Sequence, residues 1–77
     1  MQLNKKTFLE LFKIARHQFV LESEKYVYFI PIKEEVHCSD SSFLAHNETL
    51  GNVEIVDYET IIKGVVDGKK YSFRNPA

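Results

Sequence analysis

The segment IKGVVDGKKYSF, residues 62–73, decides the fold. Two apolar runs flank Asp67-Gly68, and an Asp-Gly pair between such runs is a strong signal for a tight β-hairpin turn, because glycine accepts positive φ. The segment therefore predicts two antiparallel strands, over about 61–66 and 69–74, that form a hairpin.

The same turn determines which residues of the hairpin lie opposite each other. Val66 faces Lys69 and Gly64 faces Tyr71, so that the Tyr71 ring can cover the bare backbone of Gly64. One face of the hairpin is expected to join the core, and it holds Ile62, Val66, Tyr71 and Phe73. The other face is expected to be a basic outer surface, and it holds Lys63, Lys70, Ser72 and Arg74 beside Ile61 and Val65.

The N-terminal segment predicts one amphipathic helix over about 4–20. Asn4 is a favourable N-cap, and Leu3 can form a hydrophobic staple with Phe8 at the start of the helix. At about 100° per residue, the apolar side chains of the segment share one narrow stripe. The stripe consists of Phe8, Leu11, Phe12, Ala15 and Phe19. We expect this aromatic ridge to pack on a sheet.

Residues 25–32, KYVYFIPI, predict a strand that is buried on both faces, because aromatic and β-branched residues alternate without a polar side. Pro31 cannot donate a ladder hydrogen bond, so it marks the end of this strand, a bulge or an outer edge. A further short strand is expected over about 34–38.

Two more segments favour strands. Residues 43–46 can form either a strand or one helical turn, and we expect a strand. In residues 53–58, Val53 and Ile55 alternate with Glu54, which is typical of a half-buried strand. Loops rich in Ser, Asp and Asn separate these segments.

Together these elements predict a single α+β domain over 1–77, in which the N-terminal helix packs on an antiparallel sheet of four to five strands. Apolar residues make up 44% of the chain, which is enough to form a core and excludes a disordered polar tail. A domain of this size has roughly 4–12 kcal/mol of stability, which leaves little to maintain a large strained catalytic cleft.

The net charge of -1 excludes a uniformly basic nucleic-acid binder. This small value arises because basic and acidic segments of the chain cancel each other. Residues 1–20 and 61–77 each carry four basic and one acidic residue, net +3, whereas residues 21–60 carry two basic and nine acidic residues, net -7. An acidic surface of this kind can attract a basic partner protein. Its candidate binding residues are Glu34, Glu35, Asp40, Glu48, Glu54, Asp57 and Glu59. The alternative is that the basic ends pair with the acidic middle inside the fold.

The basic C-terminal hairpin is a second candidate surface, for nucleic acid. Its basic residues are Lys63, Lys69, Lys70 and Arg74, and Tyr26, Tyr28 and Tyr71 could stack on bases if they are exposed. The hairpin register, however, places Tyr71 on the face opposite the basic one. Lysines beside a tight turn also protect a sheet edge from aggregation, which is the simpler explanation of the charge.

No group of residues predicts catalysis or metal binding. His37 and Cys38 are neighbours on a predicted strand and therefore point to opposite faces, so His37 is badly placed to activate the Cys38 thiol. The spacing of His17, His37, His46 and Cys38 matches no zinc-ligand pattern. We therefore expect no enzyme activity, no metal and no cofactor.

The composition also indicates a compartment. Cys38 is the single cysteine, so no internal disulfide can form, and the charged residues between Phe8 and Val20 interrupt any signal-peptide or membrane-spanning pattern. We therefore expect a cytoplasmic protein.

The sequence thus leads to three hypotheses of function. The first is a small non-enzymatic protein-binding module, such as an inhibitor or regulator of a host protein of the phage or mobile-element kind. The second is a nucleic-acid-binding protein or small ribonuclease that uses the basic hairpin. The third is a structural subunit that forms a homodimer through a sheet edge.

Overall fold

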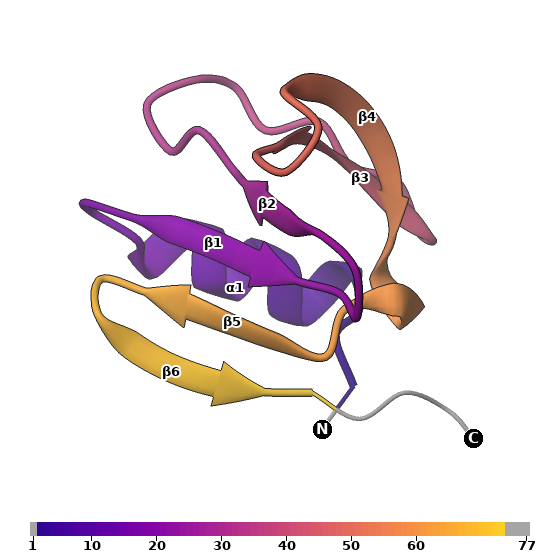
Figure 1. Cartoon of the computed structure of the whole chain (residues 1–77). Helices are drawn as coiled ribbons and strands as arrows, with labels where there is room; N and C mark the ends of the chain where they lie inside the picture. The colour runs from indigo at the N-terminus through magenta and orange to yellow at the C-terminus, as the bar shows by residue number, and fades with distance from the viewer. Residues whose placement is uncertain (1, 74–77) are drawn as a thin grey trace.

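The computed structural model describes residues 2–73 and shows one helix packed on a six-stranded antiparallel sheet (Figure 1). Along the chain the elements are α1 (Lys5–Ile14), β1 (Phe19–Glu22), β2 (Val27–Phe29), β3 (Ser42–Asn47), β4 (Asn52–Asp57), the short 3-10 helix η1 (Tyr58–Thr60), β5 (Lys63–Val66) and β6 (Lys69–Ser72). The strand order in the sheet is β4-β3-β2-β1-β5-β6. The predicted α+β class is confirmed, with six strands in place of four to five.

The helix is shorter than predicted, and a strand that the sequence analysis missed follows it. The helix begins after Asn4, whose side chain accepts a hydrogen bond from the Thr7 amide as an N-cap, and it ends at Ile14 rather than near residue 20. Ala15 is already extended, with φ -67° and ψ 128°. Phe19 belongs to β1 and not to the helical stripe, yet its side chain is fully buried.

A distant side chain enforces this early helix end. The Asp67 carboxylate accepts hydrogen bonds from the backbone amides of Arg16, His17 and Gln18, at 2.9, 2.7 and 3.0 Å. These three amides would otherwise bond to helical carbonyl groups four residues earlier. The turn of the β5–β6 hairpin therefore holds the chain between α1 and β1 outside the helix.

The strands between helix and hairpin also differ in length from those expected. The strand predicted over 25–32 is shorter in the structure, where only β2 forms a strand. The strand predicted over 34–38 is wrong: in this segment Cys38 alone forms a β-bridge, with Phe43. Pro31, which lacks an amide hydrogen, lies just beyond β2. The segment 43–46, by contrast, is confirmed as the centre of β3.

The β5–β6 hairpin has the predicted register. Val66 pairs with Lys69 and Gly64 with Tyr71, and both turn residues, Asp67 and Gly68, have positive φ. The β5 strand then pairs with β1, which places the hairpin beside the first strand of the sheet.

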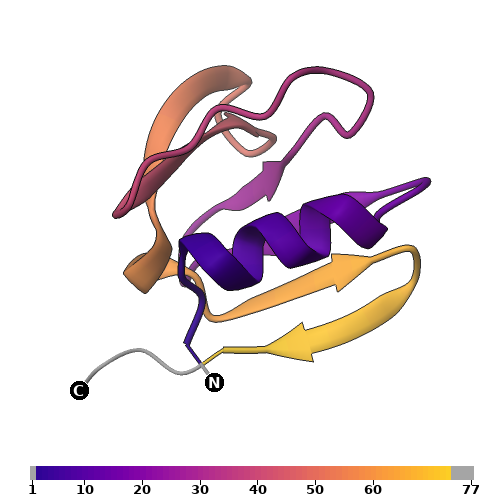
Figure 2. The same cartoon turned by 180° about the vertical axis from the view of Figure 1, so that it is seen from behind.

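The core lies between α1 and the face of the sheet that it crosses, as Figure 2 shows from the helix side. Phe8 is at its centre, with its ring centroid 4.8 Å from that of Phe43, 5.4 Å from Phe19 and 5.6 Å from Tyr58. Four fully or almost fully buried aromatic rings from α1, β1, β3 and η1 thus join the helix to both halves of the sheet.

Candidate functional site

The face of the sheet opposite α1 has no element covering it among the described residues. Directly paired residues of antiparallel strands point to the same face, and the pairing defines one row that crosses all six strands of this face. The row runs through Val53, His46, Phe29, Val20, Val65 and Lys70. It is half-buried over the central strands and exposed at β3 and β4.

Exposed apolar side chains gather at one end of this open face. Four of the five large exposed hydrophobic residues in the described chain belong to the β3–β4 hairpin, and the fifth is Ile14 at the end of α1. Ile55 is 74% exposed, Val53 50% and Leu44 38%, and Leu44 pairs directly with Ile55. We call Leu44, Val53 and Ile55 the β3–β4 strip. Contiguous exposed apolar residues of this kind are typical of interaction sites.

Two hollows lie on either side of Leu44. The first, of about 50 Å³, has Glu34 and Glu35 in its wall and Leu44, His46 and Val53 among its other lining residues. We call it the acidic hollow. The second, of about 260 Å³, is mostly apolar, and we call it the apolar hollow. It is lined by His37, Cys38, Ser39, Ser42, Phe43, Leu44 and Ile55.

This arrangement suits a partner with both apolar and basic groups. Side chains of a partner could fill the apolar hollow and cover Ile55, while the aliphatic part of a lysine or arginine lies on Leu44 with its charge beside Glu34 and Glu35. Asp57 adds a third exposed carboxylate, two residues after Ile55 on the same face of β4.

The other predicted acidic residues lie elsewhere. Asp40, in the turn before β3, forms an ion pair with Lys5 at 3.4 Å. Glu54 points to the core side of β4, where it accepts a hydrogen bond at 3.2 Å from the buried Asn47 side chain. Glu48 lies in the β3–β4 turn and Glu59 on η1. The structure therefore places Glu34 and Glu35 beside the strip, whereas Asp57 lines another cleft, of about 400 Å³, together with Asp40 and Glu59.

The basic residues of the hairpin are divided between its two faces. Lys63 and Lys70 share the open face, since Lys63 pairs with Ser72 and Lys70 with Val65. Lys69 lies on the opposite face, with its ammonium 5.3 Å from the centre of the Tyr71 ring. Tyr71 is thus beside a lysine, contrary to the sequence analysis, although it is half-buried. Arg74 lies outside the described residues.

His37 and Cys38 both line the apolar hollow, and His37 and His46 line the acidic hollow. Cys38 is a free, half-buried cysteine beside Tyr58, whose hydroxyl donates to the Ser39 carbonyl at 2.9 Å. Burial raises the pKa of Tyr58 well above its ordinary value, so the phenol stays protonated. Within residues 2–73, no three His, Cys, Asp or Glu side chains gather in a way that could hold a metal ion.

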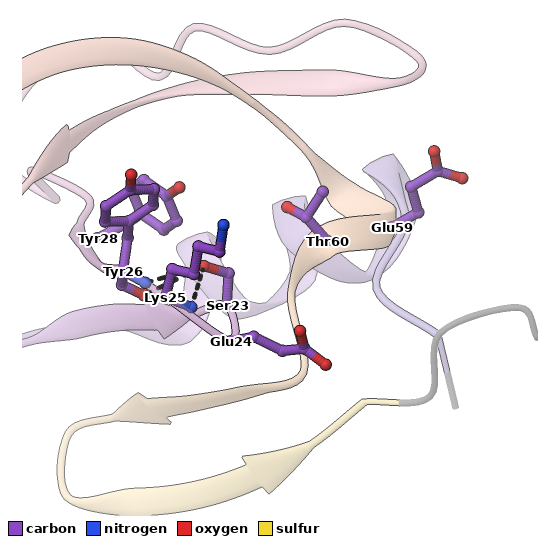
Figure 3. Close-up of a pocket in the computed structure, with 7 residues that line it drawn as sticks. All are labelled: Ser23, Glu24, Lys25, Tyr26, Tyr28, Glu59 and Thr60. Carbon is purple, nitrogen blue, oxygen red and sulfur yellow. Dashed lines mark hydrogen bonds between the residues drawn. The ribbon is translucent and has the colours of Figure 1, made fainter.

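A further cleft, of about 610 Å³, lies at the β1–β2 turn (Figure 3). Two tyrosines, Tyr26 and Tyr28, stand edge to face at one end, with ring centroids 6.3 Å apart. The Ser23 hydroxyl oxygen accepts hydrogen bonds from the backbone amides of Lys25 and Tyr26. Figure 3 shows the Glu24 carboxylate directed away from the tyrosines.

The sequence pattern of residues 53–58 does not reveal the β3–β4 strip, because it predicts the wrong side of β4 as the buried one. It predicts Val53 and Ile55 as the buried positions, whereas Val56 is buried and Glu54 is half-buried. A carboxylate on the inner side hid the true alternation, because Glu54 is held there by Asn47. The signal in the sequence was the pair of apolar residues Val56 and Tyr58, two positions apart on one side of the strand. Both are buried, and they indicate which side of β4 faces the core.

Comparisons of the chain with protein-family models, with curated proteins and with solved structures found no match. In the part of the chain that the structure describes, no helix has the length and apolar character needed to cross a membrane.

Proposed function

We propose that this chain is a small non-enzymatic protein-binding module and that the β3–β4 strip with its two hollows is its binding surface. The observation that carries the proposal is the exposure of Ile55, Val53 and Leu44 together on the one sheet face that α1 leaves uncovered. Exposed apolar side chains contribute little to the core. Where several of them gather at one place, they indicate a surface that a binding partner covers.

The chemistry around the strip supports a protein rather than a nucleic acid as the partner. Glu34 and Glu35 place negative charge in the wall of the acidic hollow, and Asp57 adds a carboxylate at the end of β4; this charge would repel a phosphate backbone and attract lysine and arginine side chains. Cys38 is free, which fits a reducing compartment, and we place the proposed binding in the cytoplasm.

The test is affinity capture with the immobilised protein from the cells that make it, using matched variants. Ile55→Ser removes the most exposed apolar side chain of the strip, and Ile14→Ser removes an equally large, 54% exposed side chain from α1. We expect a stoichiometric partner that is retained by the wild-type protein and by Ile14→Ser, and is lost with Ile55→Ser. Thermal melting checks that both variants stay folded.

Capture of the same proteins by Ile55→Ser and wild type would contradict the assignment of the strip. Retention of RNA instead, lost when Lys63 and Lys70 are reversed to Glu, would support the nucleic-acid alternative.

A further inference from the structure

The sheet ends in two strands, β4 and β6, that each have one unpaired side within the described residues (Figure 1). An unpaired strand exposes a row of amide and carbonyl groups and readily adds another strand. The strand β6 is itself an extended segment of basic character, with the sequence KKYS. It therefore has the chemistry that the strip is expected to bind.

The direction of the strands allows one copy to extend the sheet of the next. Every neighbouring pair in the order β4-β3-β2-β1-β5-β6 is antiparallel, and six is an even number, so β4 and β6 run in opposite directions. When two copies stand side by side in the same orientation, β6 of one copy is therefore antiparallel to β4 of the other.

The hydrogen-bonding groups at the two edges also match. The Tyr58 amide donates to the Ser41 carbonyl, at 3.1 Å, so by alternation Asp57 and Ile55 direct their backbone groups away from β3. The Asp57 carbonyl also accepts a hydrogen bond from the Thr60 hydroxyl at 2.8 Å, and its second lone pair is left for a partner strand. The Phe73 amide donates to the Ile62 carbonyl at 2.8 Å, so Ser72 and Lys70 direct theirs away from β5. The outward-directed residues of both edges have their side chains on the open face.

The charges of the edges are opposite. Asp57 is an exposed outward-directed residue of β4, and Lys70 is an exposed outward-directed residue of β6. Two β4 edges would bring the Asp57 carboxylates of both copies near each other, and two β6 edges would bring lysines together, so association of like edges is disfavoured.

We propose that the β4 edge binds the β6 edge of a second copy of this chain, antiparallel, with Asp57 opposite Lys70 of the second copy. Ile55 then lies opposite Ser72 of the second copy. This inference rests on the proposed function, because it names the partner of the β4 side of the strip. Such an interface joins two different surfaces, so it repeats from copy to copy and builds a ring or a linear array.

The contact is small and charged, so we expect association that depends on concentration and weakens with salt. Sedimentation velocity of the wild-type protein over a wide concentration range, at low and high ionic strength, measures both effects. The variants Asp57→Lys and Lys70→Asp each place like charges opposite one another. We expect the self-association of each variant alone to be weaker than that of the wild-type protein by about tenfold or more.

Mixing these two variants gives the decisive result. In the mixture Lys at position 57 of one variant meets Asp at position 70 of the other, and the native pair forms at the next interface, so association should return. Glu48→Lys and Lys63→Asp carry the same charge changes away from the edges, since Glu48 lies in a turn and Lys63 on β5, and they should associate like wild type.

Three outcomes would overturn the proposal. The first is a wild-type protein that stays monomeric at every concentration. The second is loss of association with Asp57→Lys but not with Lys70→Asp, which would indicate a symmetric β4–β4 dimer. The third is failure of the mixture to associate. The capture experiment with Ile55→Ser is independent of these results, so a monomeric protein that still loses its partner with Ile55→Ser refutes the self-association alone.

Discussion

Replacing Gly64 by alanine should destabilise the fold through close contacts of the added methyl group, the closest of them with Leu21. A Cβ at this position would lie 2.7 Å from Leu21 Cδ2, 3.1 Å from the Val20 carbonyl oxygen and 3.4 Å from Phe73 Cε2. Leu21 is fully buried and the Val20 carbonyl belongs to the neighbouring strand, so neither can move away freely.

The size of the effect follows from two opposing contributions. Overpacking of a closed core costs about 1–3 kcal/mol, and the lower entropy of the unfolded alanine chain returns about 0.4–1 kcal/mol. We expect a net loss of about 1–2 kcal/mol in the free energy of unfolding, which lowers the Tm of a domain of this size by roughly 4–16 °C.

Urea unfolding of a double-mutant cycle isolates the contact. Leu21→Ala alone should cost about 2–5 kcal/mol, but with Gly64→Ala the combined loss should be smaller than the sum by about 1–2 kcal/mol, because the new methyl group occupies the space that Leu21 leaves. The control is Gly68→Ala, which has φ +85° and no atom within 4 Å of the added Cβ. It should lose about 1–2 kcal/mol through backbone strain and show no coupling to Leu21. Additive losses for Gly64→Ala and Leu21→Ala, or a Gly64→Ala protein as stable as wild type, would refute the steric argument.

Four further predictions concern stability and are checked by thermal or urea unfolding. Phe8→Ala empties the centre of the aromatic cluster and should cost about 3–5 kcal/mol, which leaves a barely folded chain; a smaller loss than that of an exposed-site variant would contradict the assigned core. Asn47→Ala removes the acceptor of the Leu50 amide at 2.9 Å and should cost about 1–3 kcal/mol, mostly by opening the β3–β4 turn. Tyr58→Phe removes the hydroxyl that donates to the Ser39 carbonyl and contacts Cys38, and should cost about 1 kcal/mol, without change in the far-ultraviolet circular dichroism. Hydrogen bonds from the backbone amides of His17, Gln18 and Arg16 lower the pKa of Asp67. The stabilising effect of this carboxylate is therefore present above the unfolded-state pKa of about 4 and is lost as the pH falls through the folded-state pKa. Asp67→Asn should lower the Tm at neutral pH, and this difference in Tm should shrink in acid.

The parts of the fold that depend on local chemistry could be predicted from the sequence. The Asp67-Gly68 turn specifies its own conformation and hence the register of β5 and β6, and Asn4 specifies the start of α1. The end of α1 could not be predicted, because Phe19 reaches the core equally well from a helix or a strand. What decides between them is a carboxylate that lies 49 to 51 residues further along the chain.

The candidate site was harder to predict than the fold for a similar reason. The acidic surplus of the middle segment is visible in the sequence, but charge alone does not say which carboxylates remain on the surface near one another. Glu54 is turned inward by Asn47 and Asp40 is paired with Lys5. The β3–β4 strip depends on which side of β4 faces the core, and that is settled by tertiary contacts of Val56 and Tyr58.

The contact of Asp67 with the three amides before β1 has a consequence for how the chain folds. The sequence of residues 15–19 is compatible with a longer helix. The β5–β6 hairpin prevents it, because Asp67 accepts hydrogen bonds from the amides of Arg16, His17 and Gln18. A chain that lacks β5 and β6 should therefore carry a helix that runs on past Ile14 and no β1. We therefore expect the conformation of β1 to depend on the β5–β6 hairpin, which contacts it from the other end of the described chain.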